Sequence, residues 1–207
     1  MIRSFTQVRF NTAGTTAAEF ALVLPLAILI LFGVIDTGIY GWKLNRVEKA
    51  AQMGVRMASV TDPVDSGMVG FEFVGQTING VTYTQGDTIQ ASALGVDTCD
   101  GSLASCSCTP NCPWTISYSS AALNRIVARM QVVDPAIQAS NVVVEYRGSG
   151  LGFAGDPSGV QISPLITVKV KNLSYRPLTG LFFRISIPLP SFSSTLTMED
   201  ANGSVST

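Results

Sequence analysis

Residues 20–35 read FALVLPLAILILFGVI and contain no charged side chain. As an α-helix this run is about 24 Å long, and its extension through Tyr40 reaches about 31 Å, the thickness of a bilayer's hydrocarbon core. We therefore predict a retained transmembrane helix over about residues 18–40. A cleaved secretory signal peptide fits less well, because Glu19 stands at the entry of the run and no small-residue cleavage site directly follows it.

The transmembrane run continues into an amphipathic stretch that we expect to lie in water. Apolar residues recur there at three- and four-residue spacing, which is typical of one helix face. Pro63 cannot continue a helix and disfavours the helical conformation at Asp62, so one long helix is predicted over residues 15–60. Small residues at four-residue spacing are candidates for close helix–helix packing. They are Gly33, Thr37, Gly41, Ala50, Gly54 and Ala58.

Asp36 directly follows the charge-free run, and at membrane depth it needs a partner or water. Tyr40 and Trp42 come next, and because such aromatic residues favour the membrane–water interface, we place Asp36 at the outer interface. Basic residues lie on both sides of the run, so charge alone does not orient the helix. They are Arg3 and Arg9 before it and Lys43, Arg46, Lys49 and Arg56 after it.

Four cysteines lie in a loop at residues 97–113 that is rich in Ser, Gly, Pro and Asp. They are Cys99, Cys106, Cys108 and Cys112. Their spacing lacks the two separated knuckles of a usual zinc site. Two disulfides in an exported domain fit better, and they place residues 61–207 outside the cytoplasm. Pairing Cys106 with Cys108 would close a very tight ring, so the other two connectivities are favoured and both stay open.

The exported domain has an α+β pattern in which an antiparallel sheet packs on the long helix. Asn79-Gly80 predicts a hairpin over residues 76–83, and spaced apolar residues predict a helix around Leu123–Met130 that is capped by Ser119 or Ser120. Strands are predicted at residues 71–74, 115–119, 142–147, 165–171 and 195–198. The apolar stretch Leu181–Ile187 is predicted to form a strand or a short helix.

Composition argues against an enzyme. The chain has no histidine, which removes His-based acid–base catalysis and His-ligated metal sites. Its net charge of −1 argues against a nucleic-acid partner. Asp97 and Asp100 are expected to be solvated loop acids. We therefore predict no catalytic, cofactor-binding or metal-binding residues.

The N-terminal third resembles the TadE-like family, the minor pilins or pseudopilins of the tight-adherence (Flp-type) type IV pilus system. The resemblance covers about residues 9–60. It depends on Gly14, Glu19, Phe20, Pro25, Gly33, Asp36, Gly38, Ala50, Ala51, Gly54 and Arg56. The rest of the chain matches only in general form, as a variable exported domain.

The resemblance implies that a prepilin peptidase removes a leader, residues 1–14, by cutting between Gly14 and Thr15. Glycine would let an extended backbone approach the peptidase closely. Glu19 would then be the fifth residue of the mature chain, where it could pair with the new amine of the same or a neighbouring subunit. Pro25 would loosen the helix and leave a carbonyl for a neighbour.

The resemblance also implies partners and a location. Besides membrane lipid and the peptidase, the expected partners are other pilin and pseudopilin subunits and the inner-membrane pilus assembly platform. The chain would cross the inner membrane once, with a cytoplasmic N-terminus and a periplasmic or extracellular domain, and would enter a surface pilus. Its expected role is pilus biogenesis, adhesion and surface attachment. The alternative function is a single-pass membrane-anchored binding module that never enters a filament.

Overall fold

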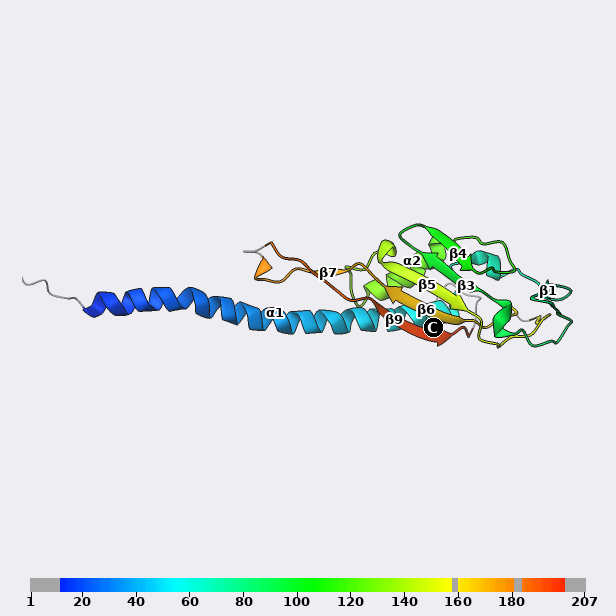
Figure 1. Cartoon of the computed structure of the whole chain (residues 1–207), viewed down its shortest axis with the longest axis horizontal. Helices are drawn as coiled ribbons and strands as arrows, with labels where there is room; N and C mark the ends of the chain where they lie inside the picture. The colour runs from blue at the N-terminus through cyan, green and yellow to red at the C-terminus, as the bar shows by residue number, and fades with distance from the viewer. Residues whose placement is uncertain (1–11, 158–159, 181–183, 200–207) are drawn as a thin grey trace, which may run out of the picture. The chain divides into compact units, whose positions relative to one another are not determined.

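The computed structural model describes residues 12–157, 160–180 and 184–199 of the chain (Figure 1). The chain forms two compact units: Met1–Gly41 with Arg176–Ile187, and Trp42–Tyr175 with Pro188–Thr207. The boundary therefore falls inside the long helix instead of at its end. Residues 176–187 belong with the N-terminal part of the helix, although the sequence suggested a single exported domain from residue 61 onward.

The first unit contains the N-terminal part of helix α1, which spans Thr12–Val60 and contains Pro25 without ending there. Every residue from Ala17 to Leu31 is exposed in the described structure. The helix has one window that is long and apolar enough to cross a membrane, and none of that window is buried. An apolar surface of this length cannot remain in water, so it favours a membrane or another apolar partner.

The second unit is built on a five-stranded antiparallel sheet with the order β4-β3-β5-β6-β9. The strands are β3 (Val96–Asp100), β4 (Ser105–Thr109), β5 (Val142–Arg147), β6 (Leu165–Val170) and β9 (Phe192–Thr197). This unit also contains the short pair of β1 (Thr77–Ile78) with β2 (Val81–Thr82). A second short pair is formed by β7 (Ser174–Tyr175) and β8 (Ile187–Pro188). Short 3₁₀ turns occur at Ser66–Met68, Ala91–Ala93 and Ala139–Asn141.

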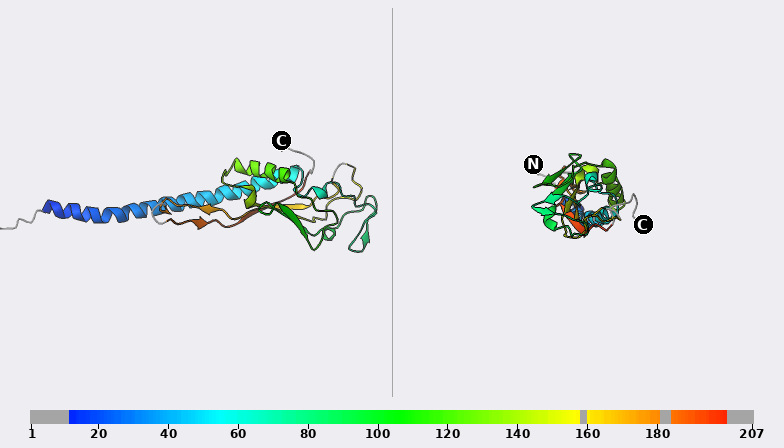
Figure 2. Two further views of the ribbon diagram at one scale, coloured as in Figure 1. Left: turned by 90° about the horizontal axis from the view of Figure 1, so that it is seen from above. Right: turned by 90° about the vertical axis from the view of Figure 1, so that its right-hand side faces the viewer.

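Helix α2 (Ser120–Gln131) and the C-terminal part of α1 lie side by side on one face of this sheet (Figure 2). The Ser119 side chain caps α2 by accepting a hydrogen bond from the Ala122 amide. Gly54 lies where α1, α2 and β6 meet, because a Cβ added there would be 2.7 Å from Met130 Sδ and 3.3 Å from Val168 Cγ1. The α+β fold class, with a long apolar helix and an antiparallel sheet, is therefore confirmed.

The structure confirms most predicted elements of this unit. Asn79 and Gly80 both have positive φ angles, 52° and 81°, as a two-residue hairpin turn requires. The α2 helix and strands β5, β6 and β9 also form near their predicted positions, with β9 beginning three residues earlier than expected.

Two predicted strands, at residues 71–74 and 115–119, are wrong. The apolar residues of the first stretch serve ring packing: Phe73 is buried and its ring lies 4.9 Å from that of Phe71. The backbone amide of Phe73 donates a hydrogen bond to the side chain of Gln161 and not to a neighbouring strand. Of the stretch Leu181–Ile187, residues 181–183 lie outside the described residues, and Ile187 begins β8.

The cysteine segment was predicted to be a loop, but it forms strands β3 and β4, with β3 inside the sheet. Its Ser, Asp and Gly residues hid the strands, since these residues are depleted in strands in general. Cys99 faces Cys106 directly across the β3–β4 pair. The two segments are therefore strands because they pair with each other, and their composition did not indicate this.

Candidate functional site

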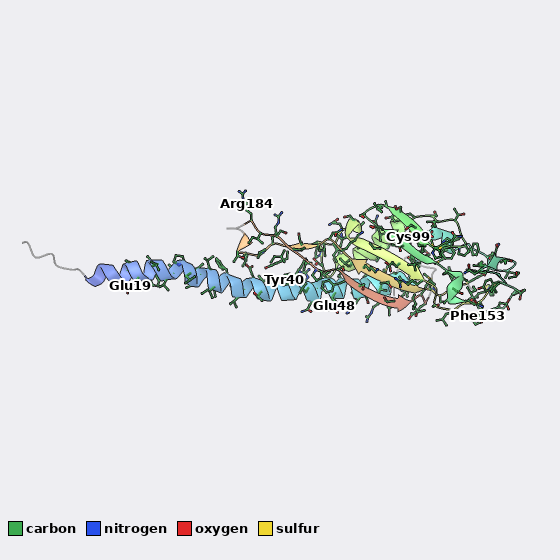
Figure 3. All side chains as sticks on the ribbon, viewed as in Figure 1. Glu19, Tyr40, Glu48, Cys99, Phe153 and Arg184 are labelled. Atoms are coloured by element: carbon green, nitrogen blue, oxygen red, sulfur yellow. A yellow bond between two sulfur atoms is a disulfide. The ribbon has the colours of Figure 1, made fainter. Side chains whose placement is uncertain are left out.

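The N-terminal part of α1 carries the predicted processing and assembly residues, and Figure 3 marks Glu19 there. Glu19 and Phe20 are both exposed, Phe20 at 66%. Gly14 and Thr15 already belong to α1, which begins at Thr12. The extended backbone expected at Gly14 concerns the chain bound to the peptidase, and in the chain by itself this position is helical. A peptidase would have to open the first helical turn, whose amide groups have no partners within the helix.

The small residues predicted to pack against other helices divide into two groups. Around Gly33 and Gly41, no described atom outside the local helix lies within 4 Å of an added Cβ, so this surface is open to a neighbour. Ala50, Gly54 and Ala58 are instead buried in the second unit. The missing side chain of Gly54 lets α2 and β6 approach α1 closely. Because all three residues are buried, they are not available to another subunit.

Thr37 belongs to the open group. Its hydroxyl donates to the Gly33 carbonyl, 2.8 Å away, within the same helix. A hydroxyl satisfied in this way can lie in an apolar environment without a partner from another chain.

Asp36 has partners that no sequence pattern indicated. Its carboxylate accepts hydrogen bonds from the backbone amides of Leu178 (2.6 Å) and Thr179 (2.9 Å) and from the Thr179 hydroxyl (2.7 Å). The residue is only 7% exposed. The polar demand of a carboxylate at the end of an apolar helix is thus met by a segment of the same chain. All of these residues belong to the first unit.

The first basic residues after the apolar run are bound within the second unit. Lys43 Nζ lies 2.7 Å from Asp134, and the Arg46 guanidinium donates to the carbonyl of Val133 near the end of α2. The same guanidinium lies 4.5 Å from the centre of the Trp42 ring. Lys43 and Arg46 therefore stabilise the fold of their own domain.

Asp97 was expected to be solvated, and this expectation is wrong. It lies on the core face of β3, fully buried, directly opposite Tyr146 of β5. Burial, followed by the charge of nearby Asp65, raises the pKa of Asp97 to about 7. Asp65 accepts from the indole of Trp114 (2.7 Å) and from the Ser117 amide (2.7 Å). The domain therefore contains a pair of carboxyl groups buried in its core.

Asp100, expected to be solvated like Asp97, instead forms a 2.5 Å ion pair with Lys171. Desolvation by itself would raise the pKa of Asp100, but the hydrogen bonds from Lys171 and Ser102 together outweigh it and hold the pKa below its ordinary value. Asp100 therefore contributes to the fold on the wet face of the sheet.

The cysteines form the two predicted disulfides, Cys99–Cys106 and Cys108–Cys112, which settles the connectivity that the sequence left open. Asp97, Cys99 and Cys106 bring potential ligand atoms within 4.8 Å of one another. The two sulfur atoms are bonded to each other, so they are not thiolate ligands. This group therefore fits a structural disulfide beside a buried acid and does not fit a metal centre.

Comparison with known families places the similarity in the N-terminal helix. Residues 14–56 match the family model described as TadE-like protein. No curated protein and no solved structure matches the chain significantly. The match begins at Gly14 and lies entirely within α1, so it includes Glu19, Pro25 and Asp36. Residues 14–56 of α1 are therefore similar to the TadE-like family, as the sequence resemblance indicated.

Proposed function

We propose that the chain is a minor pilin-like subunit of a tight-adherence type IV pilus system, acting in pilus biogenesis, adhesion and surface attachment. The observation that carries this proposal is the TadE-like match, which begins at the expected cleavage glycine and covers the helix. The unburied apolar stretch of that helix supports a single membrane pass. The role is structural, and the chain is a substrate of a peptidase and not itself an enzyme.

In this proposal α1 has two successive environments. Before cleavage it holds the chain in the inner membrane, with the disulfide-bonded domain outside the cytoplasm. After cleavage its open face around Gly33 and Gly41 packs against pilin and pseudopilin helices, while the assembly platform drives incorporation. An unpaired Glu19 in hydrocarbon is costly, so pairing with an N-terminal amine favours assembly in register.

Processing is tested by measuring the intact mass of the membrane-bound chain in its native host. We expect the wild type to lack residues 1–14 and Gly14→Val to keep them. Gly70→Val is the matched control, because Gly70 has open space for a side chain and lies outside the match, so this variant should be processed normally. A full-length wild-type chain would contradict processing and favour the anchored binding module.

Assembly is tested separately with Glu19→Ala, scored by recovery of the chain in sheared surface filaments. Glu48→Ala is the control, since Glu48 is also exposed on α1 but lies beyond the apolar stretch. We expect only the first variant to be lost from filaments while remaining in the membrane. Equal recovery of both variants would refute the assembly role of Glu19.

A further inference from the structure

The segment Arg176–Ile187 is a feature that the proposed function does not use. Its described parts, Arg176–Gly180 and Arg184–Ile187, belong to the same unit as the N-terminal part of α1, and we call them the arm. The arm contains a local turn in which the Gly180 amide donates to Pro177 and the Arg184 amide donates to Gly180. It runs alongside α1 in Figures 1 and 2, and in Figure 3 the side chain of Arg184 points away from α1 at the level of the helix before Tyr40.

The level of the arm along the helix follows from the hydrogen bonds of Asp36. The charge-free run ends at Ile35, so Asp36 marks the point where α1 leaves an apolar environment. Because Asp36 holds the amides of Leu178 and Thr179, the arm is fixed at that same level. When the apolar run occupies the hydrocarbon core, the arm lies where acyl chains meet headgroups.

The exposed side chains of the arm suit that boundary. Leu178 and Ile185 are about half exposed, at 49% and 50%, and Arg176 and Arg184 are exposed as well. The arm surrounds a hollow of about 610 Å³ that is lined by both arginines together with Leu178 and Ile185. The sequence from residue 176 to residue 187 contains no acidic residue.

This combination matches one chemical partner. A guanidinium group pairs with phosphate through two parallel hydrogen bonds, and basic residues beside a membrane attract anionic lipid headgroups. Exposed leucine and isoleucine beside them favour the ends of acyl chains. We propose that the arm is a second membrane-binding element, which inserts its apolar side chains at the outer interface and binds the phosphates of anionic phospholipids through Arg176 and Arg184.

This inference deepens the proposed function and depends on the membrane anchoring by α1, but it does not depend on cleavage or on filament assembly. Anchoring is checked first by flotation of the full chain with phosphatidylcholine vesicles. A chain that fails to float would overturn both the anchor and the arm. A chain that floats allows the depth of the arm to be measured by itself.

Depth is measured by fluorescence quenching in vesicles that contain phosphatidylcholine brominated near the glycerol end of its acyl chains. The reporter is Leu178→Trp in a Trp42→Phe background, and the buried Trp114 of the second unit serves as a constant reference. Val132→Trp is the matched control, since Val132 is 74% exposed at the end of α2. We expect strong quenching of the tryptophan at position 178 and no extra quenching at position 132.

Headgroup binding is measured with the same reporter after phosphatidylglycerol is added. The readout is the amount of phosphatidylglycerol that gives half of the change in quenching. Removal of one arginine should raise that amount about fivefold, as expected for one basic residue near an anionic surface. Arg184→Gln is therefore compared with Arg147→Gln, a substitution of an exposed arginine on β5.

Equal quenching of positions 178 and 132 in a floating chain would overturn the proposal. So would a bromine-independent change at position 178 that depends on protein concentration, because a second copy of the chain would then cover the arm. If the Arg184 and Arg147 variants needed the same amount of phosphatidylglycerol for half of the change in quenching, the phosphate contact would be overturned.

Discussion

The buried acid Asp97 makes the stability of the domain depend on pH. Among the described residues, neither oxygen of its carboxylate has a hydrogen-bond partner when the group is charged. A protonated Asp97 can donate to the nearby Asp65 carboxylate and so meet the polar demand of both groups. We therefore expect the folded domain to hold this proton tightly and to lose stability when the proton leaves.

The sign and size of the effect follow from proton linkage. The pKa of Asp97 is about 7 in the folded chain, against an ordinary value of 3.8 that applies when the chain is unfolded. Because the folded state binds the proton more tightly, the contribution is complete below the unfolded pKa and is lost as pH rises through the folded one. From about pH 5 to about pH 8 the free energy of unfolding should fall by about 2–3 kcal/mol.

The perturbation is Asp97→Asn, which keeps the size of the side chain and a donor for Asp65 but cannot ionise. Urea unfolding of the full chain in lipid nanodiscs, in a Trp42→Phe background, is followed by the fluorescence of Trp114, whose indole donates to Asp65. The wild type should show the loss between about pH 5 and about pH 8, and the variant should lack it. Asp87→Asn, a substitution of an acid with a solvent-exposed carboxyl group, is the control and should behave as the wild type.

Two results would refute this reasoning. One is a wild type whose free energy of unfolding changes by less than about 0.5 kcal/mol over that range, since burial would then not have raised the pKa. The other is an Asp97→Asn variant that keeps the full pH dependence, because another group would then be responsible.

Three further predictions concern packing, the arm and the disulfides. Gly54→Val should destabilise the domain by about 1–3 kcal/mol in urea unfolding, because the new side chain meets packed neighbours, whereas Gly41→Val should leave the urea midpoint unchanged. Asp36→Asn should speed hydrogen exchange of the Leu178 and Thr179 amides by about tenfold or more, measured by mass spectrometry. Unchanged exchange would show that Asp36 does not hold the arm. Replacing both Cys99 and Cys106 by alanine should cost about 2–3 kcal/mol in thermal or urea unfolding, and a smaller loss would mean that the sheet holds this hairpin unaided.

Local sequence patterns predicted those helices and strands whose signal is contained in one continuous stretch of the chain. The charge-free run and Pro63 predicted the long helix, which extends from Thr12 to Val60. Periodic apolar residues predicted α2, and alternation predicted β6, because in each case one face of the element is buried. The TadE-like resemblance was accessible for the same reason, since its residues follow one another along a single helix.

What only the tertiary structure decided depends on partners distant in sequence. Asp36 is held by an amide 142 residues away, and the buried Asp97 lies opposite Tyr146 of β5, which is outside the cysteine segment. The stripe of small residues looks uniform in sequence, but its second half is covered by α2 and the sheet. A residue's own type determines which environments it tolerates, whereas the folded chain determines which environment it receives.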